Sequence, residues 1–168
     1  MPDTDENLHT AFAGESQANR KYLAFAKKAE QEGYPNVGRM FKAISEAETI
    51  HAMNHFQAMG AIKGTADNLE TAMGGEHYEV NEMYPPMLEA AQEEEQKAAI
   101  RSFGAALATE KVHEGMYQNA LTCVTEGSDI EPVTYWVCPI CGQTFEGDDI
   151  PDKCPVCNAP KAKFMKFE

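Results

Sequence analysis

The chain has 168 residues, 43% of them hydrophobic, and a formal net charge of −13 at pH 7. This acidic excess excludes a nucleic-acid binder, which needs a basic face. No apolar run approaches the length of a membrane span, and residues 1–10 lack the apolar segment of a secretory signal. Four of the five cysteines stand in Cys-x-x-Cys pairs, which indicates metal ligation in a reducing compartment. We therefore expect a cytoplasmic protein that binds neither nucleic acid nor a membrane.

Helix-forming residues dominate from Asn7 to about Thr125, and helix breakers divide this stretch. The first helix is predicted to end at 33–36, where Gly-Tyr-Pro-Asn stands, and the second within 60–67. Two consecutive prolines, 85–86, should kink or interrupt the third helix. A turn near 93–95 precedes a fourth helix. Four helices with mostly short connections predict a mainly α protein built on a four-helix bundle.

The two helical halves resemble each other at a fixed offset of 62 positions. Any two helical halves share alanines by chance, but aromatic, basic and histidine residues that recur at one offset favour an internal repeat. We therefore predict a duplicated helical hairpin. The matching pairs are Asn19/Asn81, Tyr22/Tyr84, Arg39/Arg101, Phe41/Phe103, Glu48/Glu110 and His51/His113.

The composition changes after Thr125. Residues 126–132 contain Gly, Ser, Asp and Pro and indicate a linker, and from Val133 onward aromatic and β-branched residues accompany turn glycines. The remaining segment is too short to fold well without a cross-link, which a bound metal would supply. We expect a helical domain at 1–127 and a small metal-binding domain at 128–168.

Two Glu-x-x-His pairs recur within the repeat. Glu48 and His51 lie one helical turn apart, as do Glu110 and His113, so each pair shares one helix face. One such pair is weak evidence for a metal, since surface ion pairs have the same spacing. Residues 6–9 show it too, and we assign them to the exposed first turns of the first helix.

Three more carboxylates lie on otherwise apolar stripes, where a charge is costly unless it is paired or metal-bound. Glu15 lies on the first helix, and Glu76 and Glu79 form a one-turn pair on the third. One Glu from each of two helices, with Glu-x-x-His from each of the other two, is the di-iron carboxylate arrangement of helix bundles. Oxygen donors with two imidazoles suit iron or manganese better than a soft metal.

The C-terminal segment carries a tetrahedral metal signature. Two Cys-x-x-Cys pairs are separated by twelve residues, a pattern that fits iron and is also typical of a structural zinc ribbon. The residues after each pair, Gly142 and Asn158, tolerate the left-handed conformation of a tight turn that aims N–H groups at sulfur. The fifth cysteine, Cys123, is interpreted as a core thiol. The expected ligands are Cys138, Cys141, Cys154 and Cys157, with Tyr135, Trp136, Phe145, Phe164 and Phe167 packed around them.

Together these motifs resemble the rubrerythrin family over nearly the whole chain. The resemblance depends on Ala-Gly-Glu-Ser-Gln-Ala at 13–18, the two Glu-x-x-His pairs, Gly-Glu-x-x-Glu at 75–79 followed by Glu-Met-Tyr-Pro at 82–85, and the cysteine ribbon. A plain ferritin lacks the ribbon and the extra Glu79. One departure is Pro86, because the family usually has a single proline here, and it concerns the local helix geometry rather than the ligands.

The resemblance implies a ferritin-like bundle with a di-iron site and a C-terminal rubredoxin-like ribbon. The implied ligands are Glu48 and Glu110 as bridges, Glu15 on the first iron, and Glu76 and His113 on the second. Glu79 and His51 would alternate on the first iron, Glu79 in the diferric and His51 in the diferrous state. Tyr22 and Tyr84 would donate hydrogen bonds to ligating carboxylates, with simple aromatic packing as the alternative.

The implied activity is that of a non-haem peroxidase that reduces hydrogen peroxide to water in oxidative-stress defence. Electrons would come from a donor protein, a rubredoxin or an NAD(P)H-dependent reductase, through one iron held by the four cysteines. We expect that the linker does not let the ribbon reach its own bundle's irons. The resemblance implies a homodimer in which the thiolate centre of one subunit faces the di-iron site of the other. Zinc in the ribbon of a recombinant protein would stop turnover.

Two other interpretations remain open from the residues alone. The bundle could be a ferroxidase or iron store whose ribbon is a structural zinc module, a site that would not need Glu79. Alternatively, a zinc-ribbon interaction module could stand on an inert bundle, and the bundle carboxylates would then bind no metal.

Overall fold

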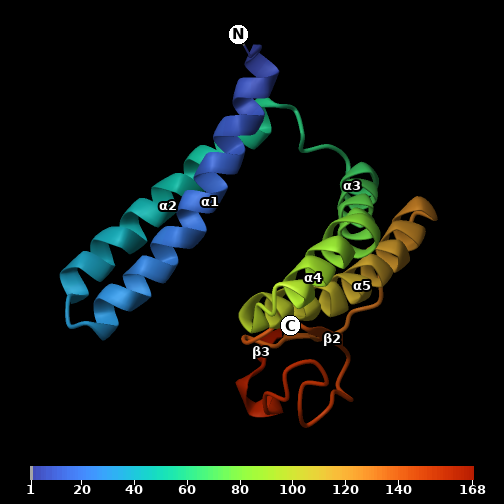
Figure 1. Cartoon of the computed structure of the whole chain (residues 1–168). Helices are drawn as coiled ribbons and strands as arrows, with labels where there is room; N and C mark the ends of the chain where they lie inside the picture. The colour runs from blue at the N-terminus through green and yellow to red at the C-terminus, as the bar shows by residue number, and fades with distance from the viewer. Residues whose placement is uncertain (1) are drawn as a thin grey trace. The chain divides into compact units, whose positions relative to one another are not determined.

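The computed structural model describes residues 2–168, which form helices followed by a small sheet (Figure 1). The fold is mainly α, with a small three-stranded sheet at the C-terminus. The chain divides into two compact units, residues 1–63 and 64–168. Its elements are α1 (Thr4–Gln31), α2 (Pro35–Ala58), α3 (Thr65–Tyr78), a π-helical turn η1 (Glu79–Met83), α4 (Tyr84–Glu93), α5 (Lys97–Thr125), β1 (Tyr135–Val137), β2 (Thr144–Glu146), a 3-10 turn η2 (Lys161–Lys163) and β3 (Met165–Phe167).

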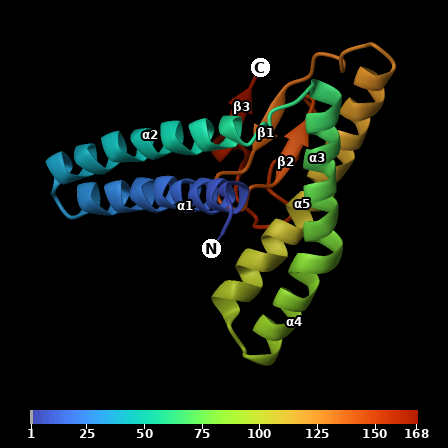
Figure 2. The same cartoon turned by 90° about the horizontal axis from the view of Figure 1, so that it is seen from above.

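The first unit is the antiparallel hairpin of α1 and α2, which lie side by side in Figure 2. Buried Asn19 on α1 holds the two helices in register. Its amide Nδ2 donates to the carbonyl oxygen of Ser45 at 2.8 Å and lies 2.6 Å from Oγ1 of Thr49. The Ser45 hydroxyl donates in return to the carbonyl of Asn19 at 3.1 Å. Buried polar groups satisfied in this way fix one arrangement of the helices.

The second unit packs α3, η1 and α4 along α5. The predicted interruption near the two prolines is confirmed: α3 ends at Tyr78, one π-helical turn follows, and α4 restarts at Tyr84. Pro85 and Pro86 lie in the first turn of α4, where a missing N–H group costs little. The double proline is therefore accommodated by a widened turn, and the helix continues beyond it.

The predicted repeat is visible in the packing of both hairpins. The rings of Tyr22 and Phe41 have centroids 6.0 Å apart and an interplanar angle of 40°. Their counterparts, Tyr84 and Phe103, give 6.3 Å and 42°. The repeat is not complete, because Asn19 is buried between helices whereas Asn81, its counterpart, is exposed and donates to a carbonyl of its own helix.

The ribbon is a three-stranded antiparallel sheet of order β2-β1-β3. Trp136 donates from Nε1 to the carbonyl of Gly147 at 3.0 Å, and Phe145 stacks on Phe164 with centroids 5.2 Å apart. These three aromatic residues pack with the cysteines, as predicted. The prediction was wrong for Phe167, whose side chain lies on edge strand β3 and is 54% exposed. Cys123 is half-buried in α5, so it is only partly the core thiol that we expected.

Among the described residues, none of the helices combines the length and the apolar character that a membrane crossing would need.

Candidate metal centres

The first unit holds one cluster of potential ligands, Glu15 from α1 with Glu48 and His51 from α2. One ligand atom of each lies within 4.8 Å of the others. The Nδ1 atom of His51 is 2.9 Å from Oε2 of Glu48. The imidazole of His51 is 55% exposed whereas the carboxylate of Glu48 is 16% exposed. Within residues 2–63 this imidazole has a single hydrogen-bond partner, so only one of its two nitrogens is held.

The second unit holds the corresponding cluster, Glu76 from α3 with Glu110 and His113 from α5, again within 4.8 Å. The Nδ1 atom of His113 is 2.7 Å from Oε2 of Glu110 and 3.9 Å from Oε1 of Glu76. All three side chains are half-buried. The two units therefore carry matching clusters of two carboxylates and one imidazole, and the Nδ1 atom of each histidine faces the carboxylates.

Crowding of negative charge marks the second cluster. Burial, followed by the charge of Glu110 and a hydrogen bond with it, raises the pKa of Glu76 to about 7. Burial and Glu110 also raise the pKa of Glu79, and His113 acts in the opposite direction. The pair of Glu76 and Glu110 thus retains a proton near neutral pH in the absence of a cation. A bound cation would take the place of that proton.

Glu79 is the first residue of the π-helical turn and follows Glu76 by one helical turn. It stands outside the three-residue cluster but close enough to Glu110 and His113 for their charges to affect it. Isolated π-turns inside helices are frequent at functional sites. The turn at Glu79 is a backbone feature that the sequence pattern did not reveal.

The two predicted tyrosines lie beside aromatic residues. Tyr22 packs against Phe25 and Phe41 within the first unit. Tyr84 packs against Phe103, and burial and then the charges of three neighbouring glutamates, led by Glu79, raise its pKa. Tyr84 therefore keeps its hydroxyl hydrogen near the acidic cluster. Within each unit, neither tyrosine hydroxyl makes a hydrogen bond to a carboxylate.

The third Glu-x-x-His spacing is confirmed as a surface feature. Glu6 forms a capping box with Asp3 at the start of α1, in which each side chain accepts from the other's backbone N–H at 2.9 and 3.1 Å. His9 is exposed and lies 3.8 Å from Asp5. A helix cap therefore explains this pair without a metal.

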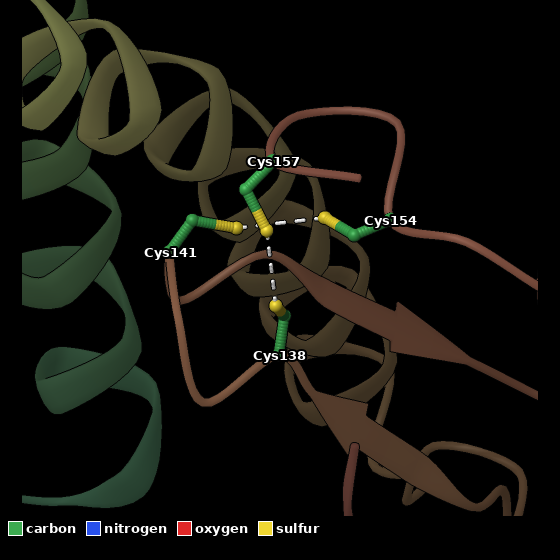
Figure 3. Close-up of side chains that lie close together, drawn as sticks. All are labelled: Cys138, Cys141, Cys154 and Cys157. Atoms are coloured by element: carbon green, nitrogen blue, oxygen red, sulfur yellow. Dashed lines mark hydrogen bonds between the residues drawn. The ribbon is translucent and has the colours of Figure 1, made fainter. Parts of the chain in front are cut away.

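Four cysteine sulfurs converge at the end of the ribbon (Figure 3). The Sγ atoms of Cys138 and Cys157 are 3.5 Å apart, and so are those of Cys141 and Cys154. This separation is too long for a disulfide, which has an S–S bond of about 2.05 Å. Metal–sulfur bonds of about 2.3 Å in a tetrahedron would place the sulfurs about 3.8 Å apart. The four thiols therefore fit one tetrahedral metal ion.

Tight turns shape both cysteine pairs. Gly142 has φ +84° and Asn158 has φ +64°, so the predicted left-handed conformations are confirmed. Burial raises the pKa of the Cys138 thiol, but hydrogen bonds from the backbone N–H groups of Ile140 and Cys141, together with those to the thiols of Cys157 and Cys141, lower its pKa to about 7. The first turn thus aims donors at Cys138 and favours its thiolate, whereas burial raises the pKa of the Cys141 and Cys157 thiols, so a metal must displace their protons.

The ribbon lies against α5 of its own chain, within the second unit. The Nε2 atom of His113 on α5 is 2.7 Å from Oγ1 of Thr144 on β2. The ribbon therefore contacts the ligand cluster on α3 and α5 of its own chain through Thr144, while the expectation that the linker keeps the four cysteines from the irons of their own bundle stays a prediction. Sequence reasoning missed Thr144, because no local pattern predicts which face of the ribbon meets the helix.

The donor sets fit three iron ions. Carboxylate oxygens and imidazoles from two matched clusters suit a carboxylate-bridged pair of iron ions, and four converging thiolates suit one more. A ferritin-like helical fold with such clusters and a rubredoxin-like ribbon defines a class of non-haem iron proteins.

Known proteins share this combination. The family described as Rubrerythrin matches residues 6–121, and its rubredoxin-like domain matches residues 136–165. Rubrerythrin-2 of Clostridium acetobutylicum is 40% identical over 98% of this chain and 96% of its own length. Nigerythrin of Nitratidesulfovibrio vulgaris is 34% identical over 98% and 86%. A structure of fully reduced, all-ferrous nigerythrin aligns with a TM-score of 0.58 at 33% identity, covering 99% of this chain and 88% of that one.

The chain belongs to the rubrerythrin family. It is accordingly a di-iron oxidoreductase with a rubredoxin-like domain, in a family associated with oxidative stress.

Proposed function

We propose that this protein is a peroxidase that reduces hydrogen peroxide to water at a di-iron site and receives its electrons through the four-cysteine ribbon. The observation that carries the proposal is the joint presence of two matched carboxylate–imidazole clusters and one thiolate cluster in a single chain. A store of iron needs no one-electron centre beside its carboxylates, whereas a peroxidase that turns over must be re-reduced.

The reaction sets the requirements on the site. Each hydrogen peroxide takes up two electrons and two protons, its O–O bond breaks, and two water molecules form. Ferrous ions held by the two carboxylate–imidazole clusters would supply the two electrons, and an iron held by the four cysteines would allow their return one at a time. Solved structures of nigerythrin, a relative, are described as fully reduced, partially reduced and mixed-valent, so iron in that protein takes up several oxidation levels.

The proposed division of ligands follows the two clusters. Glu15, Glu48 and His51 would serve one iron and Glu76, Glu110 and His113 the other, with Glu48 and Glu110 as bridges. We propose that both clusters belong to one di-iron site. The first hairpin leaves large apolar side chains exposed, as half of a bundle would, among them Phe25, Ile44 and Met53. We propose that the assembled form is a homodimer.

Glu79 is proposed as the mobile carboxylate of the site. It begins the π-helical turn, so its backbone lies at the one place where the third helix departs from regular geometry. Burial raises its pKa, which favours a carboxyl group that can take up a proton when it leaves a cation. Tyr84, which stays protonated beside Glu79, would donate a hydrogen bond to the displaced group.

The histidine that exchanges with Glu79 is proposed to be His51. Its ring is 55% exposed and is held at one nitrogen within its unit. His113 is 29% exposed and held at both nitrogens. A ring tied on one side can swing onto or away from a metal at lower cost than a ring tied on both, so the two equivalent positions of the repeat would have different roles.

An external protein is proposed as the electron donor, a rubredoxin or an NAD(P)H-dependent reductase. Free thiols in two Cys-x-x-Cys pairs are typical of a reducing compartment, and we propose the cytoplasm.

The decisive experiment is a peroxide titration of the anaerobically reduced, iron-loaded protein, followed by stopped-flow absorption. We expect rapid reoxidation at one peroxide for each di-iron site, and slower reoxidation in Glu79→Ala than in the control Glu82→Ala. Glu82 is a neighbouring exposed carboxylate of the same π-turn. Slow reoxidation by peroxide with fast reoxidation by oxygen would favour a ferroxidase instead, and a protein that retains no bundle iron would exclude both activities.

A further inference from the structure

The imidazole of His113 is held from two sides within the second unit. Its Nδ1 atom faces the carboxylates, 2.7 Å from Oε2 of Glu110. Its Nε2 atom faces the ribbon, 2.7 Å from Oγ1 of Thr144, the first residue of β2. The ring therefore joins the acidic cluster on the helices to the domain that carries the cysteines.

The hydrogen bonds of Thr144 determine which ring nitrogen carries a hydrogen. The threonine hydroxyl has one hydrogen, and its oxygen lies 3.1 Å from the carbonyl oxygen of Gly142, which can only accept. With that hydrogen directed at Gly142, the threonine oxygen offers lone pairs to Nε2, so Nε2 must donate. Nδ1, 2.7 Å from Oε2 of Glu110, then shares a hydrogen with that carboxyl group in the absence of a metal, and a cation bound between the carboxylates would take the place of this hydrogen.

We propose that Thr144 is a positioning residue for the di-iron site, which holds His113 in the Nε2–H tautomer with Nδ1 directed at the metal. An outer hydrogen-bond partner of this kind fixes the orientation of a ligating imidazole and raises its basicity. The inference depends on the proposed di-iron site and adds to it a residue supplied by the ribbon rather than by the helices.

The same threonine connects the two kinds of site. Gly142, which accepts from Thr144, directly follows Cys141, and its own N–H donates to the carbonyl of Cys138 at 2.9 Å. Two consecutive hydrogen bonds therefore lead from the first cysteine turn to the imidazole of His113. A shift of the ribbon on α5 would disturb the ligand, so the arrangement couples docking of the ribbon to the geometry of the metal site.

Within the first unit, the other half of the repeat shows no such support. His51 occupies the position equivalent to His113, and within residues 2–63 its ring is bonded to Glu48 alone. The ribbon thus gives one of two matched histidines a second support. We expect that support to appear as a difference in metal affinity.

The test is a cobalt titration of the metal-free, full-length protein. Cobalt bound to four thiolates gives intense charge-transfer bands, and cobalt bound to oxygen and nitrogen gives weak visible bands, so the two kinds of site are read separately. Thr144→Val keeps the shape of the side chain and removes the hydroxyl, whereas Thr144→Ser keeps the hydroxyl. Thr134→Val alters a threonine of the same ribbon that belongs to neither ligand cluster.

We expect Thr144→Val to weaken cobalt binding at the oxygen–nitrogen site by about 10-fold to 100-fold, with the thiolate bands unchanged. Thr144→Ser and Thr134→Val should bind like the unaltered protein. Unaltered affinity in Thr144→Val, or an equal loss in Thr134→Val, would overturn the proposal. Neither result depends on peroxide. The positioning role of Thr144 can therefore fail while the peroxidase function holds, and the peroxidase function can fail while the role of Thr144 holds.

A second measurement needs no variant. In the zinc-loaded protein, long-range ¹H–¹⁵N correlation spectra report which nitrogen of His113 carries the hydrogen. We expect a slowly exchanging Nε2–H with a nuclear Overhauser contact to the methyl group of Thr144. A hydrogen on Nδ1, or an Nε2–H without that contact, would show that Thr144 does not position the ring.

Discussion

Replacement of Glu76 by glutamine should stabilise the metal-free protein, although it removes a proposed ligand. Glu76 is half-buried beside Glu110, and burial, then the charge of Glu110 and the hydrogen bond with it, raise its pKa from 4.5 to about 7. The folded protein therefore binds this proton more tightly than the unfolded chain does. Glutamine has the shape of the protonated acid and can still donate a hydrogen bond to Glu110.

The size of the effect follows from the pKa of Glu76. A change of one in pKa corresponds to about 1.4 kcal/mol, so the rise from 4.5 to about 7 sets a ceiling of about 3 kcal/mol. Because the folded pKa is raised, the contribution to stability is fully present below about pH 4.5 and is lost as the pH rises through about 7. A glutamine side chain never ionises, so the Glu76→Gln variant should gain about 2–3 kcal/mol over the natural chain at about pH 8 and almost nothing at about pH 4.5.

The assay is urea unfolding of the chelator-treated protein, followed by far-UV circular dichroism, which reports the helices. Glu70→Gln is the matched control, because Glu70 lies on the same helix α3 and is exposed. It should change the free energy of unfolding by less than about 0.5 kcal/mol at either pH. Equal stability of Glu76→Gln and the natural chain at the higher pH, or a gain that does not shrink on acidification, would refute the account of the cluster given above.

With iron or zinc bound, the sign of the effect should reverse. A metal that binds only the folded state stabilises it in proportion to the logarithm of its concentration over Kd. Glu76→Gln gives up one anionic ligand and should lose part of that stabilisation. The reversal separates a ligand from an ordinary surface carboxylate, for which metal would make no difference.

Three further outcomes are expected. Asn19→Ala should lower the free energy of unfolding by about 1–3 kcal/mol, because it leaves buried partners on α2 unsatisfied, whereas Asn81→Ala, at the equivalent exposed position, should change it by less than about 0.5 kcal/mol. Gly142→Val should lower the free energy of unfolding by about 1–2 kcal/mol, because Gly142 has φ +84°, and a chelator should remove the ribbon metal faster from this variant. Asn158→Gly should be tolerated. Equal rates of metal removal from the two variants would contradict the role of the turns. Zinc in the four-cysteine site should preserve the circular dichroism spectrum and permit one reoxidation by peroxide but abolish steady-state turnover, and undiminished turnover would exclude the ribbon as the route of electrons.

Much of the fold could be predicted because the residues that end its helices act locally. Gly33, Gly60 and Gly127 end α1, α2 and α5, and each has positive φ, a conformation that glycine adopts without strain. The prolines after Tyr84 predicted an interruption for an equally local reason, the missing N–H group. The ribbon could be predicted in the same way, because cysteine spacing and turn residues follow one another along the chain.

The rest depends on contacts between distant residues. The approach of Thr144 to His113 is set by how the ribbon docks on α5, and the burial of Asn19 by the register of α1 on α2. Neither is encoded in a periodic pattern. The internal repeat pairs Asn19 with Asn81, yet the structure buries Asn19 and leaves Asn81 exposed. Position in a repeat therefore predicts the type of residue better than its environment.

The two matched clusters illustrate how a duplicated hairpin can acquire unequal halves. The Glu–His distances are nearly equal, 2.9 Å for Glu48 and His51 and 2.7 Å for Glu110 and His113. Helix spacing alone produces this equality, since both pairs are three residues apart on a regular helix. A difference comes from outside the helices, because the ribbon follows the second hairpin and Thr144 contacts the histidine of that hairpin. A domain that delivers electrons would thereby also decide which ligand stays fixed and which is free to exchange.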